Sequence, residues 1–326
     1  MNHTSRSLAA VAVGVLAAAT LAACGSDDGG GGSSSDAKNI AFIQGVAGDE
    51  FYITMQCGIE AEAKKSGAEV TTQGPAKFDP TQQKPIVDSV VSSKPDAILV
   101  APTEVSAMQA PLQAAADAGI EVVLVDTTVK DPAFAVSQIA SDNIGGGVAA
   151  FKAIEELAPD GGKVLVVSTD PGVSTVDARA KGFEDAAKRN SAFEFLGVQY
   201  SHNEPAQAAK IVTAALQKDP DIVGVFATNV FSAEGSATGI RQAGKQGEVN
   251  VVGFDAGPAQ VKQLREGTVQ ALIAQQPDDI GAQGVQQALA ALDGKATKKT
   301  IETGSTIITK DNVDGEAKDA LYQSSC

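Results

Sequence analysis

Polar side chains follow several short apolar segments of this chain, and together they could form a site. These residues are Pro102-Thr103, Asp126-Thr127, Thr169-Asp170, Thr228-Asn229 and Asp255. Any one Asp, Asn or Thr in such a place could instead cap the following helix or form a turn. Five segment ends with the same chemistry make capping alone a weaker explanation. We therefore predict that these groups meet in a shared polar site.

The apolar segments before these residues have the pattern of buried strands. Continuous apolar runs, typical of strands covered on both faces, occupy residues 97–100, 122–125, 164–167 and 223–226. Apolar residues from Ala208 to Leu216 have the spacing of an amphipathic helix, and Pro205 opens it. Alternating strands and helices predict open right-handed α/β sheets, in which ligands bind beyond the carboxyl ends of the strands.

The number of strand–helix units indicates more than one sheet. About ten units are too many for a single small sheet. The break that we predict lies near Ser141 to Asn143, just before the glycine run 145–147. The expected fold class is α/β, with two doubly wound parallel-sheet lobes.

The same glycine run weakly resembles a dinucleotide-binding motif. Residues 145–150 fit G-x-G-x-x-A, and Asp170 stands in the place of the ribose-binding acid. However, Ser141 to Ile144 separate these glycines from the preceding strand, and a glycine-rich crossover between two lobes explains them as well. The chain contains no G-x-x-x-x-G-K-[ST] sequence, so a phosphate-binding P-loop is absent.

Composition argues against several other functions. The 326 residues carry a formal charge of −15 without a basic block, so we expect no nucleic-acid partner. Two histidines and three cysteines are too few for most metal or haem sites, so we expect no metal and no cofactor. Nucleophilic hydrolysis would have only His202 as a base and no G-x-S-x-G elbow. Paired carboxylates, as in glycosidases, remain an alternative.

The N-terminal sequence predicts export and a lipid anchor. Arg6 precedes an apolar run from Leu8 to Ala23, which is typical of a signal peptide over residues 1–23. The run ends in Leu-Ala-Ala-Cys, which resembles a bacterial lipobox and implies lipid attachment at Cys24. Residues 24–38 are mostly Gly, Ser and Asp, so we expect a flexible tether that holds the folded part outside the membrane.

Two further cysteines lie far apart in the sequence. Cys57 belongs to the first predicted helix, and Cys326 ends a polar tail, residues 313–326. An extracytoplasmic compartment permits a disulfide between them. Two unpaired thiols, one of them on a disordered tail, are an equal alternative.

Residues 39–310 resemble the ribose-type (type I) periplasmic sugar-binding proteins of ABC importers. The matching stretches are Ile40-Ala41-Phe42-Ile43, Phe51-Tyr52, Val123-Leu124-Val125-Asp126, Ile139-Ala140-Ser141-Asp142-Asn143, Lys181-Gly182-Phe183, Ala227-Thr228-Asn229, Val252-Gly253-Phe254-Asp255 and Ile273-Ala274-Gln275-Gln276-Pro277. The resemblance implies a two-lobed fold with three hinge crossings, near Ser141, Gln275 and Gly304. Residues 39–141 and 276–304 would form the N-terminal lobe, and 142–275 and 305–312 the C-terminal lobe.

The resemblance also implies a ligand site. Its positions fall at Gly45, Asp49, Phe51, Tyr52, Asp126, Thr127, Asp177, Asn203, Asn229, Asp255 and Gln275. Carboxylates accept from neighbouring hydroxyl groups, and amides donate and accept, so this set suits a sugar or polyol. The two aromatic residues would face the C–H surface of the ligand, although they could also be ordinary core.

Two positions depart from the pattern of the family. The ribose-type proteins commonly have arginine where this chain has Thr127 and Asp177. Arg179 is two residues further on and need not face the ligand. The site would then hold four carboxylates and no evident cation, which makes ribose a doubtful ligand. We expect a neutral sugar or sugar alcohol, with a cationic ligand as the alternative.

The function implied by the resemblance is ligand delivery. We expect a monomeric, lipid-anchored binding protein that captures a monosaccharide or sugar alcohol between its lobes and passes it to an ABC transporter permease. The alternatives are a sugar-converting enzyme that uses the same carboxylates and a ligand-sensing receptor subunit.

Overall fold

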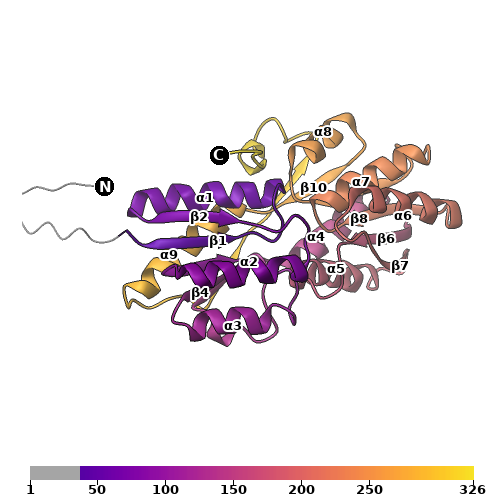
Figure 1. The fold of residues 1–326 in the computed structure, drawn as a ribbon. Helices are drawn as coiled ribbons and strands as arrows, with labels where there is room; N and C mark the ends of the chain where they lie inside the picture. The colour runs from indigo at the N-terminus through magenta and orange to yellow at the C-terminus, as the bar shows by residue number, and fades with distance from the viewer. Residues whose placement is uncertain (1–36) are drawn as a thin grey trace, which may run out of the picture. The chain divides into compact units, whose positions relative to one another are not determined.

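The computed structural model describes residues 37–326, in which strands and helices alternate along most of the chain (Figure 1). The α-helices are α1 (Glu50–Ser66), α2 (Pro80–Ser93), α3 (Gln109–Asp117), α4 (Asn143–Leu157), α5 (Ser174–Ala187), α6 (Pro205–Lys218), α7 (Val230–Gln242), α8 (Pro258–Glu266) and α9 (Pro277–Leu292). The predicted signal peptide, Cys24 and nearly all of the predicted tether lie outside the described residues.

The first sheet contains six parallel strands in the order β11-β5-β4-β3-β1-β2. These are β1 (Asn39–Ile43), β2 (Glu69–Gln73), β3 (Ala97–Val100), β4 (Glu121–Val125), β5 (Ser137–Ser141) and β11 (Thr300–Thr303). Helices α1, α2, α3 and α9 pack beside it. This sheet and its helices are called the N-terminal lobe below.

The second sheet has the order β12-β10-β9-β8-β6-β7, in which only β12 is antiparallel to its neighbour. These are β6 (Gly162–Ser168), β7 (Phe193–Tyr200), β8 (Ile222–Ala227), β9 (Asn250–Phe254), β10 (Ala271–Ala274) and β12 (Thr306–Thr309). Helices α4 to α8 accompany it, and together they form the C-terminal lobe. The predicted fold class, two doubly wound and mainly parallel sheets, is confirmed.

The chain passes between the two sheets three times: between β5 and β6, between β10 and β11, and between β11 and β12. Parallel strands require helical connections on the sheet faces, which is why both faces of each sheet are covered and the central strands are apolar throughout. All four residues of β3 are fully buried, as the continuous apolar run predicts. Helix α6 begins at Pro205, in agreement with the helical spacing of its apolar residues.

The glycine run at the start of α4 allows two helices to approach closely. A Cβ atom on Gly147 would lie 2.0 Å from the carbonyl oxygen of Arg179 in α5, and one on Gly182 would lie 2.2 Å from that of Ile144. Any larger residue at these places would push the two helices apart. Helix packing therefore accounts for these glycines.

The residues after β12 pack against the protein. Val313, Ala317 and Tyr322 are buried in the largest apolar cluster. Cys326 forms a disulfide with Cys57 of α1, with a sulfur–sulfur distance of 2.07 Å, and Figure 1 shows the C-terminus close to this helix. Residues 310–326 are called the C-terminal segment below.

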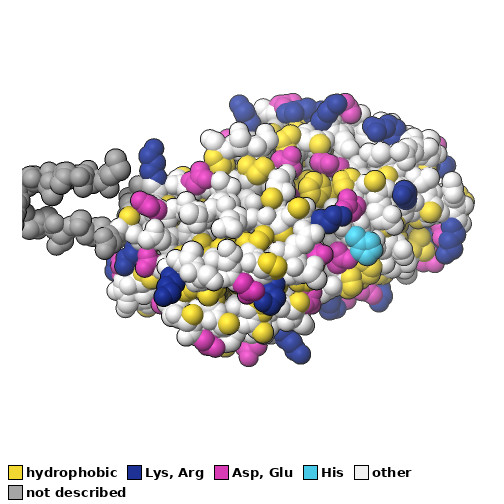
Figure 2. All heavy atoms as spheres, in the orientation of Figure 1, with side chains coloured by type: hydrophobic (Ala, Val, Ile, Leu, Met, Phe, Trp, Pro, Cys, Tyr) yellow, Lys and Arg dark blue, Asp and Glu magenta, His cyan; other side chains and the backbone are white. Residues whose placement is uncertain are grey.

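The surface carries charges of both signs. On the face shown in Figure 2, acidic and basic side chains are interspersed, and no large patch of one sign is visible. Within residues 37–326, no helix combines the length and the apolar character needed to cross a membrane.

Candidate functional site

A cavity lies between the two lobes, at the carboxyl ends of strands from both sheets. Its volume, taken as the space open to the centre of a water molecule, is about 40 Å³. It is lined by Asp49, Phe51, Tyr52, Phe78, Asp126, Thr169, Val173, Thr175, Val176, Arg179, Asn203, Asn229, Asp255 and Gln275. Eight of the residues that the sequence predicts for the ligand site are among them. Open α/β sheets bind ligands beyond this edge, because the strand ends and helix starts there leave polar groups free.

Two aspartates occupy equivalent places in the two lobes. Asp126 follows β4 and Asp255 follows β9, and each of these strands is the fourth along its sheet when counted from the β2 or β7 edge. Both residues have a positive φ, 62° and 76°, and the backbone N–H of each donates to the neighbouring strand, to Ile139 and Ile273. Asp tolerates this left-handed conformation better than most residues, but the conformation is still strained. The same backbone turn therefore occurs at both strand ends, and the two carboxylates line one cavity.

The N-terminal lobe contributes a buried carboxylate–phenol pair. Tyr52 Oη donates to Asp126 Oδ2 at 2.8 Å. Asp49 caps α1 by accepting from the backbone N–H of Phe51 at 2.9 Å, which fixes the start of this helix at the cavity. The rings of Phe51 and Tyr52 lie nearly perpendicular, with centroids 5.1 Å apart. This arrangement gives the cavity a wall that is partly aromatic.

The C-terminal lobe contributes a network around Asp255. Gln275 Nε2 donates to Asp255 Oδ1 at 2.6 Å, and the N–H of Val230 donates to Oδ2 at 3.2 Å. Gln275 in turn accepts from Ser141 Oγ at 2.9 Å, so a residue at one crossing orients a residue at another. Because these bonds fix its carboxylate, Asp255 is preorganised to accept from a ligand.

A pair of amides completes this side of the cavity. Asn229 caps α7 by accepting from Ser232, and its Nδ2 donates to Asn203 Oδ1 at 2.6 Å. Both amides keep further donor or acceptor capacity. They therefore add groups that can bind hydroxyl oxygens.

Arg179 also lines the cavity, so the prediction of a site without a cation is wrong. The side chain is only 2% exposed, and its guanidinium lies 3.9 Å from the centroid of the Phe254 ring. Nε donates to Asn143 and Nη1 to the carbonyl of Thr228, both at 2.8 Å. Nη2 has no hydrogen-bond partner among the described residues, nor has Thr169 Oγ1. These two unpartnered buried groups line the same cavity.

Burial and charge change the acidity of the cavity carboxylates. Burial raises the pKa of Asp126 to about 6, although the nearby guanidinium of Arg179 and the hydroxyl of Tyr52 act in the opposite direction. Burial also raises the pKa of Asp49 well above its usual value, and the charge of Asp255 adds to this. The pKa of Asp255 is raised by burial, with Arg179 as the main opposing effect. The guanidinium therefore favours the ionised forms of Asp126 and Asp255.

Three of the residues that the family resemblance places in the ligand site lie outside the cavity lining, namely Gly45, Thr127 and Asp177. Among the predicted strand-end residues, Thr103, Asp170 and Thr228 also lie outside it. Thr127 Oγ1 donates to the carbonyl of Pro102 at 2.7 Å, which uses its hydroxyl within the N-terminal lobe. Asp177 Oδ2 accepts from the N–H of Gly172 at 2.8 Å and stabilises the loop before α5. Arg179 lies one helical turn after Thr175 and therefore shares its face of α5, whereas Asp177 does not. The expected set of four carboxylates is thus reduced to Asp49, Asp126 and Asp255 at the cavity.

The sequence contained a signal for some of the residues that it failed to identify. Thr175, Val176 and Arg179 have the i, i+1, i+4 spacing of one helix face, which marks the side of α5 turned to the cavity. Thr169, which follows β6, lines the cavity as the pattern of polar residues at strand ends predicts, although the family resemblance did not include it. Nothing in the local sequence marks Phe78, which lies in the connection between β2 and α2.

Comparisons with known proteins agree with this geometry. A model of the periplasmic binding protein domain matches residues 40–296. The ribose import binding protein of Bacillus subtilis (strain 168) is 31% identical over 251 residues, which are 77% of this chain and 80% of that protein.

Solved structures show the same fold. An ABC transporter solute-binding protein from Agrobacterium vitis, bound with α-D-tagatopyranose, is 41% identical with a TM-score of 0.86 and covers 88% of this chain and 99% of its own. A second one from Agrobacterium vitis, with bound D-fucose, is 31% identical with a TM-score of 0.83 and covers 87% and 100%. All three relatives are binding proteins, and the two solved structures hold a monosaccharide.

Proposed function

The chain belongs to the periplasmic binding protein domain family, and from that membership we propose that it is the sugar-binding component of an ABC importer. The relatives are binding proteins of transporters and are not enzymes, so the alternative of a sugar-converting enzyme has no support. Both lobes contribute residues to the proposed binding site.

The observation that carries this proposal is the pairing of donors and acceptors around one cavity. Asp126 and Asp255 present carboxylate oxygens, while Arg179 Nη2 and Thr169 Oγ1 are buried polar groups without a partner. A buried donor without an acceptor costs about 1–3 kcal/mol, and a bound hydroxyl oxygen removes that cost. A polyol both donates to the carboxylates and accepts from the guanidinium, so it satisfies both kinds of group.

The expected ligand is a neutral monosaccharide or sugar alcohol. Arg179 already offsets part of the charge of Asp126 and Asp255, so a cationic ligand is not required to relieve their repulsion. Phe51, Phe78, Val173 and Val176 offer apolar surface to the C–H groups of a sugar ring. The tagatose- and fucose-bound relatives make hexoses and deoxyhexoses the first candidates.

The ligand is captured by closure of the two lobes. Contacts already join the lobes around the cavity: Val105 N–H donates to the carbonyl of Gly172 at 3.1 Å, and Thr128 N–H donates to Ser174 Oγ at 3.0 Å. A ligand that contacts both lobes favours this closed arrangement by its greater affinity for it. The closed form is then recognised by the permease.

Export and anchoring belong to the same proposal. The signal peptide (residues 1–23), the lipid on Cys24 and the tether that follows would hold a monomeric binding protein at the outer face of the cytoplasmic membrane. An ABC permease in that membrane is the expected partner. The support for this is the N-terminal sequence, together with the relatives named as components of transporters.

Titration calorimetry tests the proposal. D-tagatose, D-fucose, D-ribose, a hexitol and an amino sugar are titrated into the full-length protein, and into Asp126→Ala, Asn229→Ala and Asp255→Ala. Loss of one hydrogen bond to a charged group, worth about 1.5–3 kcal/mol, weakens binding about 10- to 150-fold, and this applies to the two aspartates. A neutral bond at Asn229 gives a smaller loss. Heat from the amino sugar alone, or unchanged affinity in all three variants, would contradict the proposal.

A further inference from the structure

The first part of the C-terminal segment is held by the C-terminal lobe. Arg265 of α8 forms an ion pair with Asp314 at 2.6 Å, and the backbone N–H of Val313 donates to the carbonyl of Thr309 in β12 at 3.1 Å. The backbone N–H of Tyr322 donates to the carbonyl of Ala256, just after β9, at 3.0 Å. Up to Tyr322, the segment therefore follows the C-terminal lobe.

The last residues of the segment are held by the other lobe. The N–H of Gln323 donates to Thr54 Oγ1 of α1 at 2.8 Å, and Cys326 is bonded to Cys57 of the same helix. The attachment thus changes from one lobe to the other between two adjacent residues. Cys326 lies four residues beyond Tyr322, and a fully extended chain of four residues spans at most about 14 Å. The separation of α1 from the end of β9 is limited accordingly.

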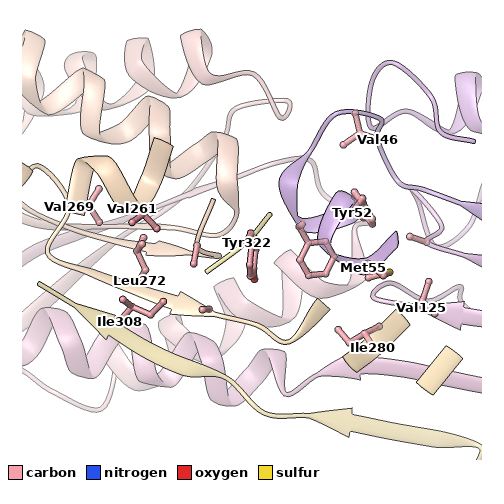
Figure 3. Packing of buried hydrophobic residues seen from close by; sticks show 14 of the residues in the cluster. Val46, Tyr52, Met55, Val125, Val261, Val269, Leu272, Ile280, Ile308 and Tyr322 are labelled. Carbon is pink, nitrogen blue, oxygen red and sulfur yellow. The ribbon is translucent and has the colours of Figure 1, made fainter. Parts of the chain in front are cut away.

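Tyr322 connects this segment to the ligand site. Its hydroxyl donates to Asp255 Oδ1 at 3.0 Å and accepts from the backbone N–H of Gln275 at 2.9 Å. Its ring lies 6.0 Å from that of Phe51. Figure 3 shows Tyr322 between a group of residues from the C-terminal lobe, including Leu272 and Ile308, and a group around Tyr52 and Met55 of α1. Tyr322 does not line the cavity, so it acts on the ligand only through these neighbours.

The segment lies beside the places where the chain passes between the lobes. A solvent-filled depression next to it is lined by Gln275 and Gln276 at one crossing, by Thr306 after another, and by Leu321 to Gln323. A connection near the crossings limits how far the lobes can rotate, separate and twist relative to one another, while it leaves the mouth of the cavity uncovered. This location distinguishes the segment from a clamp across the mouth of the cavity.

We propose that residues 310–326, closed onto α1 by the Cys57–Cys326 disulfide, form a fourth covalent connection between the lobes, and that Tyr322 is a positioning residue for Asp255. The disulfide restricts how far the lobes open, which leaves fewer open conformations to compete with the closed one. Sugar affinity therefore falls when the disulfide is lost. The statement about affinity rests on the proposed function, whereas the statement about lobe opening does not.

Small-angle X-ray scattering of ligand-free protein tests the connection. Full-length protein with Cys24→Ser, which retains only the paired cysteines, is compared with the same protein that also carries Cys57→Ser and Cys326→Ser. Treatment of the first protein with a phosphine in water provides a second route. The disulfide becomes two thiols that take their protons from a water molecule, and the phosphine takes the oxygen of that water and is oxidised to its oxide. We expect a larger radius of gyration after either change. An unchanged radius of gyration by both routes would overturn the proposed connection.

Calorimetry with D-tagatose, or with whichever monosaccharide of the panel binds, tests the link to affinity. We expect the dissociation constant to rise severalfold on loss of the disulfide. Equal affinity with and without the disulfide would refute this link. If no sugar gives heat with the unmodified protein, the proposed function fails. The scattering experiment still tests whether the disulfide restricts the opening of the lobes.

Tyr322→Phe tests the positioning role, because it keeps the ring and removes the hydroxyl. Asp255 is surrounded by the charges of Asp49, Asp126 and Arg179, and Tyr322 adds a hydrogen bond that favours its ionised form. We expect sugar affinity to fall about 10-fold or more, and the pH midpoint of the affinity profile to move upward.

Tyr200→Phe is the matched control, since Tyr200 ends β7 outside the cavity. We expect Tyr200→Phe to change neither the sugar affinity nor the pH midpoint. If Tyr322→Phe lowered the affinity through lost packing alone, its pH midpoint would stay unchanged. An unchanged pH midpoint or an unchanged affinity of Tyr322→Phe would overturn the positioning role.

Discussion

Replacing Arg179 by methionine tests the electrostatic account of the cavity most directly. Methionine has a similar length and remains compatible with the ring of Phe254, but it carries no charge and no donors. The change removes the unpartnered Nη2 that we expect to bind the sugar, and it leaves Asp126 and Asp255 without their nearest cation.

The structure gives two magnitudes for this change. Loss of one charge-assisted hydrogen bond to the ligand, about 1.5–3 kcal/mol, weakens sugar binding about 10- to 150-fold. The loss is larger at pH 8 than at pH 5.5, because Asp126, whose pKa is about 6, is mostly protonated at pH 5.5 and then needs no cation beside it. The bonds to Asn143 and Thr228 are also lost, and removing one partner from buried charges lowers the free energy of unfolding by about 3–5 kcal/mol.

Calorimetry at pH 8 and pH 5.5 measures the affinity, and urea unfolding checks that each variant is folded during the titration. Arg189→Met, at an exposed position just after α5, is the matched control. Arg179→Lys keeps the charge but not the planar fork of donors, so its affinity should lie between those of the wild type and Arg179→Met. If folded Arg179→Met and Arg189→Met bound sugar equally well at pH 8, the role assigned to this guanidinium would be wrong.

Three further predictions follow from the same geometry. As the pH rises from 4 to 7, the free energy of unfolding of the wild type should fall by about 2 kcal/mol more than that of Asp126→Asn, measured by urea unfolding. The reason is that the pKa of Asp126 is raised to about 6 in the folded state, so that this state binds more protons than the unfolded chain in this range, and equal pH profiles would contradict this. Gly45→Ala should weaken sugar binding at least 10-fold in calorimetry, because its Cβ would lie 2.4 Å from Tyr52 Oη and 2.5 Å from Phe78 Cε2. Gly315→Ala is the control, since the atom nearest to its Cβ is 3.8 Å away. Similar affinities in the two variants would show that Tyr52 can move without loss of binding. Cys24→Ser should move the protein from the detergent to the aqueous phase in a detergent-partition experiment, and partition of both proteins into the aqueous phase would argue against a lipid anchor.

Local patterns in the sequence were sufficient to predict the strands of the two sheets. The continuous apolar runs that became β3 and parts of β4, β6 and β8 are long enough for strands and are followed by helical spacing, so their identity did not depend on distant residues. The polar residues at the strand ends were identifiable for the same reason, because parallel strands place their carboxyl ends at one edge. Asp126, Asn229 and Asp255 line the cavity as this reasoning predicts.

The predictions for Asp177 and Arg179 were wrong about the direction in which each side chain points. Asp177 and Arg179 are two residues apart on α5, and the direction of each depends on how the helix is rotated against the cavity and on what the preceding loop requires. The family resemblance included Asp177 in the ligand site, but its carboxylate accepts a hydrogen bond from the backbone N–H of Gly172 and does not line the cavity. The cation of the cavity comes instead from the residue one turn beyond Thr175.

The sequence by itself determined the α/β class, the two sheets and the strand ends that could bear a site, because these depend on periodicity over short stretches of chain. Only the tertiary structure decided which side chains meet. The contact of Tyr322 with Asp255, the pairing of Cys57 with Cys326 and the position of Arg179 over Phe254 each join residues that are far apart in the sequence. Such contacts are fixed by the packing of whole helices and lobes, and no local pattern encodes them.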